Sequence, residues 1–122
     1  MNRLTDATQA RIGASLSATR ADTQAQATAL AADLEGIIAA ATSVATDDEH
    51  DPEGTTIAYE RAQAAALLAD ARARLREIDA ALARLAAGEY GRCGSCGVPI
   101  APERLAARPA TTTCISCAST AR

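Results

Sequence analysis

Apolar residues recur at helical spacing in two long segments of the chain, residues 1–46 and 57–87. In the second segment one series of apolar positions recurs every seven residues, and another interleaves with it. This alternation of three- and four-residue steps predicts a helix with one face packed along a partner. The seam positions are Ile57, Ala64, Ala71, Ile78 and Leu85, with Arg61, Leu68, Leu75 and Leu82 between them.

The first segment repeats this pattern less regularly. Two such seams joined by a short turn predict a mainly α fold, a long antiparallel helical hairpin of the coiled-coil type. In the predicted register Leu16 lies opposite Leu85, and Thr23 lies opposite Ile78. Residues 1–15 then extend past the base of the hairpin and meet the C-terminal region. The first seam consists of Leu16, Thr23, Leu30, Ile37 and Val44, with Ala27, Leu34 and Ala41 between them.

Local signals place the ends of the second helix. Asp51 is a candidate N-cap and Pro52 a candidate first helical residue, while Gly88 suits the position just after the last turn. We therefore divide the chain into a helical hairpin at residues 1–87, with an acidic tip at 47–54, and a small C-terminal module at 88–122. Leu4 and Ile12 are the expected contacts of the first helix with that module.

Composition excludes several classes of protein. Of the 122 residues, 33 are Ala and none is Phe or Trp, and all 12 basic residues are Arg. So few bulky side chains argue against a buried-sheet enzyme. The chain has no apolar run long enough for a membrane span and no apolar stretch near Met1 typical of a secretory signal, so we expect a cytoplasmic protein. A net charge of −3 argues against sequence-specific DNA binding.

The four cysteines form two CxxC pairs separated by 17 residues, a spacing typical of a tetrahedral zinc site with four cysteine ligands. We expect Gly94 and Gly97 to supply positive φ angles in the turns. Two disulfides, which suit secreted chains, or a redox-active CxxC, which usually occurs once, are the alternatives. Four protein ligands leave no position for a reactive water, so the expected Zn²⁺ is structural and the protein is not an enzyme. The predicted ligands are Cys93, Cys96, Cys114 and Cys117.

The stretch from Gly88 to Pro109 has the order G-x-Y-G-x-C-x-x-C-G-x-x-I followed by R-L-x-A-x-P, and the second C-x-x-C comes after it. This order resembles the DksA/TraR family of C4 zinc-finger proteins, and a hairpin with an acidic turn before the finger fits the same family. The resemblance implies a transcription regulator that binds RNA polymerase, inserts its coiled-coil tip into the secondary channel and modulates initiation. The alternative is a zinc-stabilised adaptor whose hairpin docks on another protein.

The tip carries five acidic residues within residues 47–53, whereas residues 84–122 carry a net charge of about +3. Such a separation of charge would orient the molecule in a charged channel. The resemblance places the tip near the polymerase active centre. By themselves, acidic residues in a turn also serve solubility and the start of a helix. The tip residues are Asp47, Asp48, Glu49, Asp51 and Glu53.

The tip departs from the family's D-x-x-D-x-A pattern. The nearest match begins with Asp48 and Asp51 and ends in Glu53, where the family has Ala. Counting back from the zinc ligands without gaps instead puts His50 and Glu53 at the two Asp positions.

Family members that respond to the alarmone ppGpp use basic residues around the finger. Arg108 matches one of them and is a candidate alarmone or polymerase contact. Ungapped counting puts Glu77 and Ala118 where two other basic residues would stand, and the five residues after Cys117 leave no room for a C-terminal helix. We therefore expect weak or absent ppGpp dependence.

Overall fold

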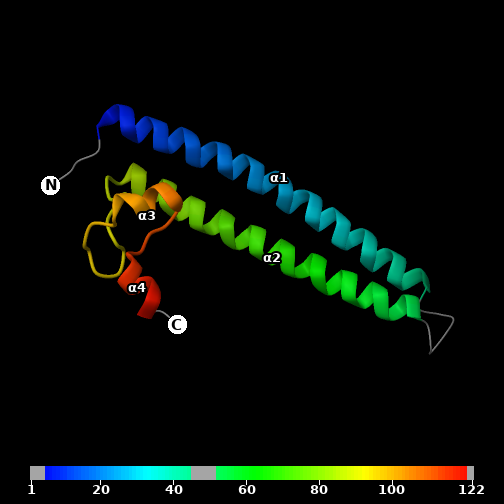
Figure 1. Cartoon of the computed structure of the whole chain (residues 1–122). Helices are drawn as coiled ribbons and strands as arrows, with labels where there is room; N and C mark the ends of the chain where they lie inside the picture. Colours follow the sequence, from blue (N-terminus) through cyan, green and yellow to red (C-terminus); the bar gives the residue numbers. More distant parts are fainter. Residues whose placement is uncertain (1–4, 45–51, 121–122) are drawn as a thin grey trace. The chain divides into compact units, whose positions relative to one another are not determined.

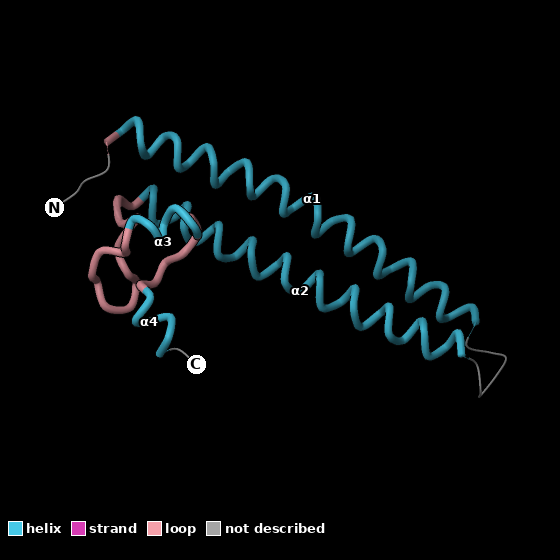
Figure 2. The backbone as a smooth tube through the Cα atoms, in the orientation of Figure 1, coloured by secondary structure: helices cyan, strands magenta, loops and turns pink. Residues whose placement is uncertain are grey.

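A computed structural model describes residues 5–44 and 52–120 of the chain. These residues contain four helices and one isolated bridge between Arg92 and Pro99, and no strand. Figures 1 and 2 show α1 and α2 side by side, with α3 and α4 in the loop-rich C-terminal region. The mainly α fold class is therefore confirmed. The helices are α1 (Asp6–Val44), α2 (Pro52–Ala86), α3 (Pro102–Ala107) and α4 (Ile115–Thr120).

The chain divides into two compact units, and each unit takes a part of both long helices. One unit consists of Met1–Ala21 and Leu75–Arg122, and the other of Asp22–Arg74. In the first unit the earlier part of α1 meets the later part of α2, and in the second unit the later part of α1 meets the earlier part of α2. The two helices therefore pair in the antiparallel sense that the sequence predicts.

The core of the unit Asp22–Arg74 consists of predicted seam positions. Small side chains dominate it, and Ala71 is completely buried, which allows the two helices to approach closely. Arg61, which the pattern also placed in the seam, is exposed because a guanidinium without a partner keeps its hydration. The side chain of Val44 lies outside the described residues. The buried residues of this unit are Thr23, Ala27, Ala64, Leu68 and Ala71.

The other unit has its core where α1 and α2 meet the C-terminal module. Leu16, Ile78 and Ala81 form the buried cluster. Ile12 packs against this cluster from α1, and Tyr90 and Ala110 of the module pack against it too, in agreement with the predicted place of Ile12 beside the module. Leu4, the second predicted contact, lies outside the described residues. The other half-buried residues on the cluster are Leu82, Tyr90 and Ala110.

One contact near the base of the hairpin bears on the predicted register. The sequence placed Leu16 opposite Leu85, and the Leu85 side chain lies over Gly13, where a β-carbon would come within 3.3 Å of the leucine Cδ2. Gly13 is three residues from Leu16, so this contact lies within one helical turn of the predicted position. The glycine thus leaves the space that a large side chain from the partner helix fills.

Local backbone geometry defines the ends of α2. It begins at Pro52, as predicted, while the predicted cap Asp51 lies outside the described residues. At the other end Gly88 has a φ of 76°, its N–H donates to the Leu85 carbonyl (3.2 Å), and the Glu89 N–H donates to the Arg84 carbonyl (2.8 Å). These two bonds form a Schellman motif, which confirms the role predicted for Gly88.

An exposed ion pair joins α1 to α2, and its contribution to stability depends on pH. Arg20 donates two hydrogen bonds to the Asp79 carboxylate (2.5 and 3.3 Å), and these bonds lower the pKa of Asp79 below its ordinary value of 3.8. Because folding lowers this pKa, the pair stabilises the fold above pH 3.8, and this contribution is lost as the pH falls through the folded-state pKa.

We therefore expect Asp79→Asn to lower the Tm by a small amount at pH 7, since exposed pairs contribute little. The difference in Tm between this variant and the unmodified protein should narrow steadily below pH 3.8. Asp70→Asn is the matched control, because Asp70 is exposed on the same helix and makes no ion pair with a described residue. A difference that widens in acid would contradict the assignment.

Candidate metal centre

Four cysteine sulfurs gather in the C-terminal module. They lie within 4.8 Å of one another, and the Cys96 and Cys114 sulfurs are 3.8 Å apart. Four thiolates bound tetrahedrally at about 2.3 Å from one ion would be separated by about 3.8 Å. All four cysteines are free thiols, so the disulfide alternative does not describe this structure. Across residues 5–44 and 52–120, no other group of three or more His, Cys, Asp or Glu side chains comes together in this way.

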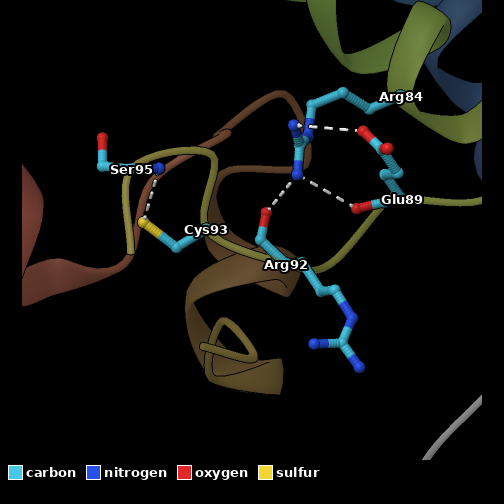
Figure 3. A network of polar contacts seen from close by, with 5 residues as sticks. All are labelled: Arg84, Glu89, Arg92, Cys93 and Ser95. Carbon is cyan, nitrogen blue, oxygen red and sulfur yellow. Dashed lines mark hydrogen bonds and ion pairs between the residues drawn. The ribbon is translucent and has the colours of Figure 1, made fainter. Parts of the chain in front are cut away.

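The first knuckle is a tight turn that begins at Cys93. The Cys93 N–H donates to the Val98 carbonyl (2.8 Å), and the Gly97 N–H donates to the Cys93 carbonyl (2.9 Å). The Ser95 N–H lies 3.4 Å from the Cys93 sulfur (Figure 3). Gly97 has a φ of 78°, as predicted, so the turn closes in a conformation that glycine adopts without strain.

Gly94 does not have the positive φ that we expected; the described glycines with positive φ are Gly88, Gly91 and Gly97. Space does not require a glycine there either, because a β-carbon would make ordinary van der Waals contacts, 3.4 Å from Arg84 Nη1 and 3.5 Å from the Thr112 carbonyl oxygen. The Gly94 N–H donates to that same carbonyl (2.7 Å), so the first knuckle is held against the segment that precedes Cys114.

The second knuckle, the turn at Cys114 and Cys117, continues directly into α4. The Cys117 N–H lies 3.5 Å from the Cys114 sulfur, and the Ala118 N–H donates to the Cys114 carbonyl (3.0 Å). Cys114 thus satisfies N–H groups at the start of the helix. The expectation that no helix fits at this end of the chain is wrong, because α4 starts between the two cysteines and includes the second one.

The metal-free thiols have strongly different pKa values. Backbone N–H groups, that of Cys114 first and that of Cys96 next, lower the pKa of Cys93 to about 5. The pKa of Cys117 is raised to about 12 by its thiol hydrogen bonds, first with Cys114 and then with Cys96 and Cys93. The cluster therefore favours one thiolate but resists ionising all four. A divalent cation among the sulfurs supplies the positive charge that four thiolates require.

Two arginines that the sequence analysis did not single out contact the knuckles. Arg84, in the last turn of α2, lies beside Glu89 and Arg92 (Figure 3). Arg104, in α3, reaches the segment before Cys114. Arg104 stands in the R-L-x-A-x-P motif, which was a signal for it, whereas a single Arg near a helix end gives no comparable signal for Arg84.

The remaining predicted site residues are not part of the cysteine cluster or lie outside the described residues. Arg108 is exposed at the end of α3, and its N–H donates to the Arg104 carbonyl (2.7 Å). Glu53 belongs to the first turn of α2, and its side chain is not described. The other four tip residues lie outside the described residues; they are Asp47, Asp48, Glu49 and Asp51.

Comparison with known proteins identifies this cysteine module. Residues 88–121 match the prokaryotic dksA/traR C4-type zinc finger. The C-terminal module is therefore a zinc finger of the DksA/TraR type. Because the match is to a C4-type zinc finger, the four clustered sulfurs form a site for one structural zinc ion.

The likeness extends beyond the zinc finger. The structure of transcription factor DksA2 from Pseudomonas aeruginosa is similar to this chain with a TM-score of 0.74 and 28% sequence identity, covering 94% of this chain and 83% of that one. The match therefore includes the two long helices, and the predicted DksA/TraR resemblance is confirmed. No curated protein matches the chain.

The likeness to DksA/TraR proteins also bears on the prediction that this protein is not an enzyme. DksA/TraR transcription factors are not enzymes, in agreement with a zinc site that has four protein ligands. Among the described residues no helix is both long enough and apolar enough to span a membrane.

Proposed function

We propose that this protein regulates transcription by binding RNA polymerase, with the tip of its helical hairpin inserted into the secondary channel to modulate initiation. The observation that carries this proposal is the similarity to DksA2 over 94% of the chain, because it includes the hairpin as well as the zinc finger. In this role the zinc ion is structural, and the hairpin and its acidic tip make the functional contacts.

Charge supports action through a protein partner. The chain has a net charge of −3, which opposes binding to the DNA phosphate backbone. Five carboxylates within residues 47–53 concentrate the negative charge at the predicted tip. Such a cluster favours docking beside basic groups or a metal ion of the partner. A polymerase partner implies a cytoplasmic location.

A polymerase retention experiment tests the proposal. The immobilised protein is expected to retain purified bacterial RNA polymerase, and the double variant Asp48→Asn and Asp51→Asn is expected to bind about tenfold more weakly or worse, because each substitution removes a charge at the contact. The matched control is Asp22→Asn with Asp70→Asn, two exposed carboxylates in α1 and α2 without described partners. The dissociation constants of the three proteins provide the measurement.

Two outcomes would contradict the proposal. If the unmodified protein fails to retain polymerase, the proposal that polymerase is its partner is wrong. Retention of a different protein in place of polymerase would favour a zinc-stabilised adaptor. If the tip and control variants bound polymerase equally well, the polymerase would remain as partner but the acidic tip would lose its proposed role.

Arg108 is the remaining candidate contact of the finger. Its side chain is exposed and forms no hydrogen bond with a described residue, so it is available to a phosphate or to a carboxylate of polymerase. Glu77 and Ala118 stand where two further basic residues would be needed for ppGpp. We therefore propose that Arg108 contacts polymerase and that ppGpp dependence is weak or absent.

A further inference from the structure

Arg84 links the end of α2 to the first zinc knuckle. Its Nη2 donates to the Arg92 carbonyl at 2.6 Å and to the Glu89 carbonyl at 3.2 Å, while its Nη1 lies 3.7 Å from the Glu89 carboxylate (Figure 3). The side chain is only 22% exposed. Since Arg92 directly precedes Cys93, this guanidinium holds the peptide group that leads into the first zinc ligand.

Arg104 makes the corresponding contact at the second knuckle. Its Nε donates to the Thr113 carbonyl at 2.9 Å, and its Nη2 donates to the Thr111 hydroxyl at 3.2 Å. That hydroxyl in turn donates to the Thr113 carbonyl (3.2 Å). Thr113 directly precedes Cys114, so a second guanidinium holds the peptide group that leads into the third zinc ligand.

The two contacts share one geometry although their arginines come from different helices, α2 and α3. We propose that Arg84 and Arg104 are positioning residues for zinc: each holds the carbonyl that directly precedes a CxxC pair, and together they slow the release of the ion. A guanidinium suits this task because its planar array of donors reaches two acceptors at once. Groups that orient metal ligands typically change metal affinity tenfold or more when they are removed.

Charge adds to the geometric effect. Zinc with four thiolates has a net charge of −2, and zinc binding must release the protons of the thiols. Two guanidinium cations next to the knuckles favour the anionic complex. Replacement of Arg84 or Arg104 by Lys or by Gln separates the geometric contribution from that of charge. Lys keeps the charge without the planar donors, whereas Gln loses the charge.

The rate of zinc release tests the proposal. Zinc-loaded protein is mixed with excess 4-(2-pyridylazo)resorcinol, and the coloured zinc complex is followed over time. We expect Arg84→Lys and Arg104→Lys each to release zinc about tenfold faster, and the Gln variants to release it faster still. Arg76→Lys is the matched control, since Arg76 is exposed two turns earlier in α2 and has no described partner.

Two further measurements separate positioning from general instability. Circular dichroism reports whether α1 and α2 remain helical, and the ligand-field bands of the Co²⁺-substituted proteins report whether four sulfurs still bind the ion. Faster release with unchanged helix content supports the proposal, as does a variant with intact helices that binds no metal. Release rates of both Lys variants within twofold of the Arg76→Lys control would overturn it.

Discussion

Replacement of Cys93 by Ser is expected to unfold the zinc finger while α1 and α2 remain helical. Within residues 88–120 only Cys93 and Ile100 are buried, so the finger has almost no hydrophobic core of its own. Structural zinc in small Cys and His sites contributes about 10–16 kcal/mol of apparent binding free energy. That is as large as the net stability of a typical domain, about 5–15 kcal/mol, and no other interaction in the finger replaces it.

Limited trypsin digestion with mass spectrometry measures this effect. Arg92 and Arg104 are the cleavage sites within the finger, because Pro109 blocks cleavage after Arg108, and we expect rapid cleavage at these two sites in Cys93→Ser and in chelator-treated protein. Ser95→Ala is the control, because it changes an exposed side chain of the same knuckle and keeps the N–H that faces the Cys93 sulfur. Protection of these sites in the zinc-free variant would show that the finger folds without the metal.

Ile78→Ala is expected to cost about 3 kcal/mol of unfolding free energy, within the usual range for a buried Ile or Leu. The Ile78 side chain is 4% exposed and forms the buried cluster with Leu16 and Ala81. Its removal leaves a cavity that these neighbours cannot fill, since Ala81 is small and both helices are held along their length. The expected fall in Tm is about 10 °C for a chain of this size.

Urea denaturation followed by circular dichroism gives the free-energy difference. Ile38→Ala is the matched control, because it removes the same atoms from a side chain that is 38% exposed. We expect the control to lose about 1 kcal/mol or less. Equal losses in the two variants would mean that the helix pair is not held together by the cluster around Ile78.

Repeating patterns of the sequence predicted the two long helices and most of their buried positions. Leu16, Thr23 and Ile78 are buried where the seven-residue repeat placed them. Pro52 and Gly88 mark the ends of α2 because each acts through its own backbone conformation. The prediction that Arg61 lies in the seam was wrong. A seven-residue repeat gives only the spacing of positions, whereas burial of a charged side chain also requires a partner, which the repeat does not reveal.

The CxxC spacing likewise predicted the zinc site, since each pair presents two sulfurs from one short turn. Only the tertiary structure revealed which carbonyls Arg84 and Arg104 hold, and that α4 starts within the second pair. The sequence by itself determined the helices, their apolar seams and the four ligands, because these depend on the identity and spacing of near neighbours. The contacts that orient the ligands join separate elements, so they were decided only when packing brought those elements together.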